Sequence, residues 1–119
     1  MKIAVTSDGT SLESPMNPRF GRAPYILIVT SEGDLVEVID NAVNVNAMRG
    51  AGIQAAKSLA DRGVEILLTG HCGPNAFTAL DAAGIKVGSD QSGSVKEVVE
   101  KCVAGKVTFA DKPNAEPHW

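Results

Sequence analysis

The hydrophobic period of this sequence changes after residue 39. Before that point, three short runs rich in β-branched residues, 2–6, 25–30 and 35–39, favour strands, and the turn residues 31–34 predict that the second and third runs form an antiparallel hairpin. Beyond it, apolar residues recur at helical spacing and alternate with short continuous apolar runs. The pattern predicts the element order β-β-β-α-β-α-β-α and therefore an α/β fold.

The later half of the chain is expected to hold three helices and two strands. Each predicted helix stops at a glycine, Gly63, Gly84 or Gly105, and the strands are expected at 64–69 and 85–88. The predicted buried stripes of the helices are Ile53, Ala56, Leu59 and Ala60; Ala76, Phe77, Leu80 and Ala83; and Val95, Val98, Val99, Cys102 and Val103. Right-handed crossovers then give a five-stranded mixed sheet with helices on its faces, in which the first strand is central, the hairpin lies on one side and the last two strands lie on the other.

A proline- and glycine-rich loop, residues 14–24, separates the first two strands. Its three prolines restrict φ and remove backbone donors, and Gly21 opens other conformations, so the loop is expected to have a defined shape. The loop carries Met16, Asn17, Arg19, Phe20 and Arg22. Two arginines beside a methionine and a phenylalanine suit an anionic ligand with a soft or apolar body. The loop is therefore either a binding site or an ordinary long connection.

Three predicted loops leave the carboxyl ends of parallel strands. They are residues 7–22, 70–73 and 89–94. Ligands of open α/β sheets bind outside these strand ends, where the N-termini of helices also converge. We therefore expect the ligand site at this edge of the sheet.

A second glycine-rich stretch, Gly50-Ala51-Gly52-Ile53-Gln54-Ala55, matches the dinucleotide pattern G-x-G-x-x-A. That pattern needs its glycines directly after a strand, and here residues 40–49 intervene, so nucleotide binding is not expected. The glycines would instead bring backbone N–H groups to a helix start beside Arg49, which favours an anion. Close packing of the helix against a neighbour explains the glycines equally well.

Cys72 follows a predicted strand and begins a predicted helix. A helix N-terminus lowers the pKa of a thiol, which would make Cys72, with His71 beside it, a soft-metal ligand. A tight strand-to-helix turn is the alternative, because one histidine and one cysteine are too few for a closed zinc site. Cys102 lies in a valine-rich stripe and is expected in the core.

The chain has 119 residues and a formal net charge of −3, so it has the size of one domain and no overall field that would attract nucleic acid or a membrane surface. We expect a single domain over residues 1–109 and a loose tail over 110–119. Neither a signal peptide nor an apolar run of membrane-spanning length is recognised, so a cytoplasmic protein is expected. Asp8 and Asp90 have no third acid near them at the sheet edge, so a metal-dependent hydrolase, and with it an enzyme, is not expected.

Three motifs resemble those of the dinitrogenase iron-molybdenum cofactor biosynthesis family. They are Asn17-Pro18-Arg19-Phe20-Gly21-Arg22-Ala23-Pro24, Gly50-Ala51-Gly52 and Thr69-Gly70-His71-Cys72-Gly73-Pro74-Asn75-Ala76, and the match spans nearly the whole chain. The resemblance implies a ribonuclease H-like fold and a protein that carries a metal cluster. Within the family the chain is most similar to the orange protein branch of sulfate-reducing bacteria, whose members hold a molybdenum–copper sulfide cluster without covalent attachment. The resemblance also implies protein partners in a cytoplasmic complex.

One residue departs from the family pattern. Carriers of the iron-molybdenum cofactor commonly have histidine before the Phe-Gly pair, whereas this sequence has Arg19, which cannot ligate a metal but can neutralise a sulfide-rich anion. The favoured hypothesis is a carrier of an anionic molybdenum–copper sulfide cluster. The alternatives are a carrier or sensor of another metal cluster, of the iron-molybdenum type, and a cofactor-free adaptor that binds a partner protein.

The candidate cluster-binding residues come from the three motifs and their neighbours. They are Met16, Asn17, Arg19, Phe20, Arg22, Met48, Arg49, Gly50, Gly52, His71, Cys72 and Gly73. In this hypothesis the arginines supply charge, the methionines and the phenylalanine supply soft or apolar contact, and the glycines supply backbone N–H groups. Cys72 and His71 are the two candidates for direct metal ligation.

Overall fold

The computed structural model describes residues 1–41 and 51–110 of the chain. The elements are β1 (Lys2–Ser7), the 3-10 helix η1 (Phe20–Arg22), β2 (Tyr25–Thr30), β3 (Leu35–Asp40), α2 (Ala51–Asp61), β4 (Ile66–Leu68), α3 (Pro74–Ala82), β5 (Lys86–Gly88) and α4 (Val95–Val103). The strands and the three α-helices follow the predicted order β-β-β-α-β-α-β-α.

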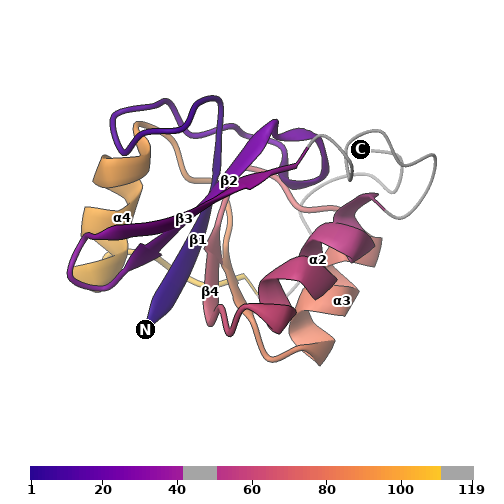
Figure 1. The fold of residues 1–119 in the computed structure, drawn as a ribbon. Coiled ribbons are helices and arrows are strands. Elements are labelled where there is room, and N and C mark those ends of the chain that lie inside the picture. The colour runs from indigo at the N-terminus through magenta and orange to yellow at the C-terminus, as the bar shows by residue number, and fades with distance from the viewer. Residues whose placement is uncertain (42–50, 111–119) are drawn as a thin grey trace.

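The five strands form one mixed sheet in the order β3-β2-β1-β4-β5. β2 pairs antiparallel with both β1 and β3, whereas β1 pairs in parallel with β4, and β4 in parallel with β5. The first strand is therefore central, with the hairpin on one side and the two later strands on the other, as predicted. This is the α/β, ribonuclease H-like arrangement that the family resemblance implies (Figure 1).

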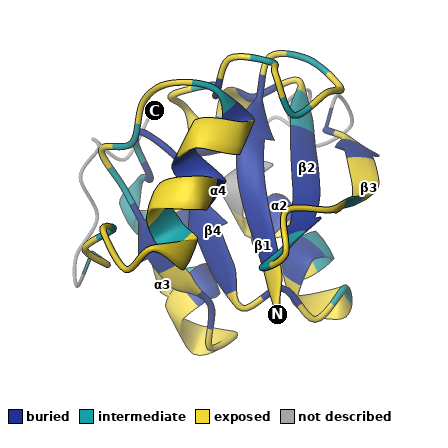
Figure 2. Cartoon of the chain, turned by 90° about the vertical axis from the view of Figure 1, so that its left-hand side faces the viewer, coloured by how far each residue is buried: buried dark blue, intermediate teal, exposed yellow. Residues whose placement is uncertain are grey.

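Helices cover both faces of the sheet. α4 lies on one face, and α2 and α3 lie on the other (Figures 1 and 2). Strand β1 serves both cores, because alternate side chains of a strand point to opposite faces: Ile3 and Val5 pack with α4, and Ala4 packs with α2 and α3. This explains why the central strand is a continuous apolar run.

The ends of α4 follow from its sequence. The Ser94 side chain accepts a hydrogen bond from the Glu97 N–H at 3.2 Å, and the Glu97 carboxylate accepts one from the Ser94 N–H at 3.1 Å, which is a capping box. The hydrogen bond from the Ser94 backbone lowers the pKa of Glu97. At the other end, Gly105 adopts φ +75, a conformation that favours glycine, so the predicted stop is confirmed.

The predicted buried stripes are partly wrong. In α2 the buried residues are Ala55, Ala56 and Leu59, whereas Ile53 is 46% exposed and Ala60 is exposed. The physical reason is that α2 packs against α3 as well as the sheet, which centres its buried face on Ala55 and Leu59.

The outer residues of the other stripes are also more exposed than predicted. Ala83 is exposed, Phe77 is partly buried, and Val103 is 54% exposed. Cys102, expected in the core, is half-buried and packs against the edge of the α4 core. Among the described helices, α4 is the one on its face of the sheet, and its stripe is fully covered from Val95 to Val99 but not at its C-terminal end.

The segment after α4 packs along the outer strand β5. Val107 joins the α4 core, and the Ala110 N–H donates to the Val87 carbonyl oxygen at 2.7 Å. The Lys86 ammonium lies 5.6 Å from the centre of the Phe109 ring, a cation–π distance. Residues 106–110 therefore run beside β5. Of the predicted loose tail, 110–119, Ala110 is hydrogen-bonded to β5, and residues 111–119 lie outside the described residues.

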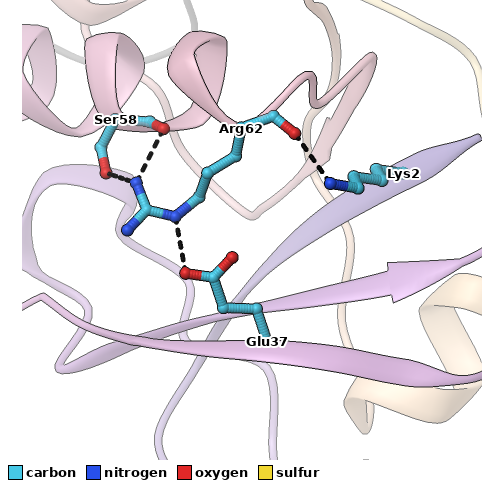
Figure 3. Close-up of polar contacts among 4 residues, drawn as sticks. All are labelled: Lys2, Glu37, Ser58 and Arg62. Carbon is cyan, nitrogen blue, oxygen red and sulfur yellow. Dashed lines mark hydrogen bonds and ion pairs between the residues drawn. The ribbon is translucent and has the colours of Figure 1, made fainter.

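A polar cluster fastens the end of α2 to the hairpin. The Arg62 Nε donates to the Glu37 carboxylate at 2.8 Å, and its Nη1 donates to the Ser58 carbonyl and hydroxyl oxygens at 3.0 and 2.6 Å (Figure 3). The Lys2 ammonium donates to the Arg62 carbonyl oxygen at 3.1 Å. This cluster lies at the amino end of β1, opposite the edge where the predicted site lies.

In residues 1–41 and 51–110, no helix is both long and apolar enough to cross a membrane.

Candidate functional site at the carboxyl edge of the sheet

The loop between β1 and β2 is hydrogen-bonded to the end of β1 and to the start of α4. The Asp8 N–H donates to the Pro15 carbonyl oxygen at 3.0 Å, and the Met16 N–H donates to the Gly93 carbonyl oxygen at 2.8 Å. The Val95 N–H, at the first turn of α4, donates to the Ser14 carbonyl oxygen at 2.9 Å. The loop therefore lies across the carboxyl edge of the sheet with a fixed backbone.

The same loop is joined to the turn after β4. The His71 N–H donates to the Pro18 carbonyl oxygen at 2.6 Å, the Phe20 N–H donates to the His71 carbonyl oxygen at 3.1 Å, and Arg19 faces His71 in a parallel bridge. Gly70 is needed here, because a Cβ on it would lie 2.7 Å from the Pro18 carbonyl oxygen. Two of the motifs that carry the family resemblance are thus in direct contact.

The third predicted loop also reaches this edge. The Asp90 N–H donates to the Gly70 carbonyl oxygen at 2.8 Å, and the Gln91 N–H donates to the Thr69 carbonyl oxygen at 3.1 Å. Loops 7–22, 70–73 and 89–94 therefore meet, as the topology predicted. Asp90 adopts φ +60, which Asp tolerates better than most residues.

Two buried threonines lie beneath the loop, and the sequence did not single them out. Thr6 and Thr69 are fully buried at the ends of β1 and β4, and their hydroxyl oxygens are 2.9 Å apart. The Thr6 hydroxyl also donates to the Asn17 carbonyl oxygen at 2.6 Å. Because the Thr6 hydroxyl has one proton and a carbonyl only accepts, the Thr69 hydroxyl must supply the proton between the two threonines. The available sequence signal was that each is the first polar residue after an apolar run, 3–5 for Thr6 and 66–68 for Thr69.

Two apolar side chains of the loop enter the cores on opposite sides of the sheet. Phe20 is 1% exposed and packs with Ala55 and Ala56 of α2, while Met16 is 6% exposed and packs in the core under α4. Both were expected to contact a ligand, whereas the structure uses them to anchor the loop. A loop that crosses the end of a sheet lies over both cores, so its apolar side chains gain more from burial there than from exposure.

Arg19 and Arg22 are exposed and lie on either side of the Phe20 anchor. The Arg22 N–H donates to the Arg19 carbonyl oxygen at 3.1 Å, which closes a 3-10 turn and keeps the two arginines one turn apart. Within the described residues, the Arg22 side chain forms no hydrogen bond or ion pair. The turn thus presents two fixed cationic residues at the carboxyl edge of the sheet.

The N-terminus of α2 adjoins this turn. η1 packs against α2. Because α2 leads into β4, it runs opposite to the parallel strands. Its first turn, which includes Gly52, therefore faces the carboxyl edge of the sheet (Figure 1). The first N–H groups of a helix have no partner inside the helix and attract anions. Met48, Arg49 and Gly50, which were predicted to belong to the site, lie outside the described residues.

Cys72 is turned into the core. Its side chain is 1% exposed, and burial raises the pKa of the thiol to about 12. The predicted lowering of this pKa is therefore wrong, because removal of the thiol from water outweighs its position before α3. The Cys72 Sγ lies 3.8 Å from the carbonyl oxygen of Gly73, the N-cap residue of α3. Neither Cys72 nor Cys102 forms a disulfide.

His71 contributes to the candidate site chiefly through backbone hydrogen bonds. Its N–H and carbonyl groups fix Pro18 and Phe20, and its side chain is half-buried. In the described ranges, 1–41 and 51–110, no three residues among His, Cys, Asp and Glu come together as a set of metal ligands. The groups that the structure does assemble are exposed arginines and backbone N–H groups, which suit an anion.

The sequence matches the dinitrogenase iron-molybdenum cofactor family over residues 1–105. The chain therefore belongs to this family of proteins. Its structure is similar to that of the apo form of the orange protein from Desulfovibrio gigas, with a TM-score of 0.91 and 44% sequence identity, covering 96% of each chain.

Two further relatives cover the fold almost completely. A putative NifB protein from Thermotoga has a TM-score of 0.81 and 33% identity, covering 96% of this chain and 97% of its own. An uncharacterized protein of Methanocaldococcus jannaschii is 31% identical over 110 residues, which are 90% of this chain and 89% of the relative.

Proposed function

We propose that this protein binds and carries an anionic metal–sulfur cluster of the molybdenum–copper sulfide type, without covalent attachment, at the carboxyl edge of its sheet. The observation that carries the proposal is the clamped segment 17–20, which is hydrogen-bonded on both sides and bears Arg19, with Arg22 one turn further on. The family match and the likeness to a protein solved in an apo form support cluster binding as the class of function.

The chemistry of such a cluster favours binding by positively charged side chains over direct ligation of the metals by the protein. A thiometallate already has sulfide ligands and negative charge, so the protein must supply cations and N–H donors. Two unit charges 4 Å apart attract by about 1 kcal/mol in water and by about 4 kcal/mol near a protein surface. Immobilising a long side chain costs about 0.5–1.5 kcal/mol, which is less than the attraction near a protein surface. A backbone that is already fixed avoids the further cost of ordering the loop.

The proposed contacts extend beyond the two arginines. Met48 and Arg49 precede α2 in the sequence, and with the N–H groups of Gly50 and Gly52 they would complete a cationic cradle for the cluster. Gly73 would offer a further N–H group at the start of α3. These contacts remain proposals that single substitutions can test.

A second candidate is a cluster of the iron-molybdenum type, which the description of the family favours. Such a cluster would call for a protein ligand, and Arg19 cannot be one. His71 and Cys72 are the nearest possible ligands, but burial keeps the Cys72 thiol protonated at neutral pH. We therefore place the molybdenum–copper cluster first.

We also propose a binding role rather than catalysis, a cytoplasmic location and transfer of the cluster to or from a partner protein. Both arginines are exposed, so a cluster held by them stays within reach of a partner. Two cysteines outside any disulfide agree with a reducing compartment.

Reconstitution tests the proposal directly. Apoprotein mixed with tetrathiomolybdate and copper(I) should give a coloured species that passes through gel filtration with the protein and is lost on denaturation. Molybdenum and copper analysis of the protein fraction is the measurement. A parallel sample is given iron(II) with tetrathiomolybdate, and retention of iron and molybdenum there, without retention of copper in the first sample, would support the second candidate. A protein that retains neither would be a cofactor-free adaptor.

A further inference from the structure

We infer that Asn17 acts as a positioning residue, which sets the Arg19 backbone in the anion site through its side-chain amide. The inference rests on the proposed function and concerns how the same site is built. It comes from the hydrogen bonds that occupy both ends of the Asn17 side-chain amide.

The Asn17 amide bridges two parts of the loop. Its Oδ1 accepts from the Arg19 N–H at 2.9 Å, and its Nδ2 donates to the Asp8 carboxylate at 2.7 Å. The orientation of the amide follows from chemistry, since a backbone N–H can only donate and a carboxylate can only accept. Each end of the amide thus makes a hydrogen bond inside the protein, and the two bonds together fix the orientation of the side chain.

The backbone of Asn17 is fixed to β1 at the same time. Its N–H donates to the Thr6 carbonyl oxygen at 2.9 Å, and its carbonyl oxygen accepts from the Thr6 hydroxyl at 2.6 Å. Thr6 is completely buried and is hydrogen-bonded to Thr69 of the neighbouring strand end. Asn17 therefore connects the rigid end of the sheet to the Arg19 backbone through its side chain.

Asn17 also fixes an acid beside the anion site. Asp8 is exposed, and its carboxylate oxygen is held in a short charge-assisted hydrogen bond by Asn17. A carboxylate at this edge opposes the attraction of the arginines for an anion. The Asn17–Asp8 pair therefore gives the site its shape and, through Asp8, limits its positive charge.

A double-mutant cycle separates positioning from contact. Tetrathiomolybdate binding would be titrated for wild type, Asn17→Ala, Arg19→Ala and the double variant. Asn17→Ala should weaken binding by about fivefold to tenfold, the effect of one lost hydrogen bond. In the Arg19→Ala background the same substitution should change binding by less than about twofold, because it acts through Arg19. Full additivity would overturn the inference.

Hydrogen exchange in the apoprotein gives a readout that needs no ligand. In Asn17→Ala the Arg19 N–H should exchange about tenfold faster, while the Phe20 N–H, held by His71, keeps its protection. Unchanged exchange at Arg19 would contradict the inference. If wild type does not bind tetrathiomolybdate, the proposed function fails, and exchange still decides whether Asn17 positions Arg19.

A milder variant covers the case in which Asn17→Ala does not fold. Asp8→Asn keeps an acceptor oxygen for the Asn17 amide and removes the negative charge. Exchange at the Arg19 N–H should stay as in wild type, and tetrathiomolybdate should bind about twofold to fivefold more tightly. Weaker binding, or faster exchange at Arg19, would contradict the role given to this pair.

Discussion

Cys72 shows at the level of a single residue how burial decides chemistry. A thiolate is needed for copper ligation or nucleophilic attack, and burial raises the pKa of this thiol from 9.0 to about 12. Burial also raises the pKa of Cys102, which is half-buried on α4. The two cysteines should therefore differ in reactivity mainly because a reagent can reach the half-buried Cys102 more easily than the buried Cys72.

We predict that iodoacetamide at pH 8 modifies Cys102 well before Cys72 in the folded protein. Mass spectrometry of wild type should show a single early modification, Cys102→Ser should show none on that timescale, and urea should expose both thiols. Early modification of Cys72 would contradict its place in the core.

The raised pKa of Cys72 also has a consequence at alkaline pH. Between pH 9.0 and about 12 the unfolded chain releases this proton while the folded chain keeps it, so the free energy of unfolding falls as pH rises. Below pH 9.0 the thiol is protonated in both states and adds no pH dependence. Cys72→Ser should show a smaller loss of stability across the alkaline range.

At the level of elements, the close approach of two loops is the feature on which the site depends. Gly70 has no Cβ, and Pro18 occupies the space that a Cβ would need. Gly88 in β5 is crowded in a comparable way, with a would-be Cβ 2.7 Å from the Val107 side chain and 2.8 Å from Leu68. The two glycines thus form a matched pair, one at the site and one in the core.

We predict that Gly70→Ala and Gly88→Ala both lower stability, by about 1–3 kcal/mol as expected for overpacking. Only Gly70→Ala should also weaken retention of the cluster, because its clash is with the backbone of the arginine loop. Urea denaturation and metal analysis after gel filtration are the two measurements. Equal effects of both variants on retention would mean that the loop position is unimportant.

The order and type of the elements were predictable because hydrophobic period and turn residues are local. The sequence also placed the three loops at one edge, since sheet topology alone brings them there. The contact between Pro18 and Gly70 was not predictable in detail, because backbone groups that every residue carries make it. The burial of Phe20 and Met16 was missed, since an apolar side chain in a loop looks the same whether it faces a ligand or a core.

At the level of the whole molecule, the net charge does not explain how the proposed site would attract an anion. The chain has a net charge of −3, so attraction for an anion must come from the local arrangement of Arg19 and Arg22. Exposed charges are screened over about 8–10 Å at ordinary ionic strength. A site built on them must therefore weaken as salt rises, whereas ligation by a buried thiolate would not.

In the proposed site, charge rather than thiolate ligation holds the cluster. Arg62 offers a matched control, since it is an arginine at the opposite end of the sheet, and ion pairs near the surface such as its pair with Glu37 are worth only about 0.2–1 kcal/mol. Arg62→Ala should retain the cluster, whereas the combined variant Arg19→Ala with Arg22→Ala should lose most of it.

The most direct measurement is the molybdenum and copper bound per protein after gel filtration across a salt series. Wild type, the Arg19→Ala and Arg22→Ala double variant, Arg62→Ala and Cys72→Ser would be compared. Retention should fall with salt in wild type, be low at every salt concentration in the double variant, and stay near the wild-type level in Arg62→Ala and Cys72→Ser. Loss of both metals in Cys72→Ser, with retention indifferent to salt and to both arginines, would instead mean that a copper–thiolate bond holds the cluster.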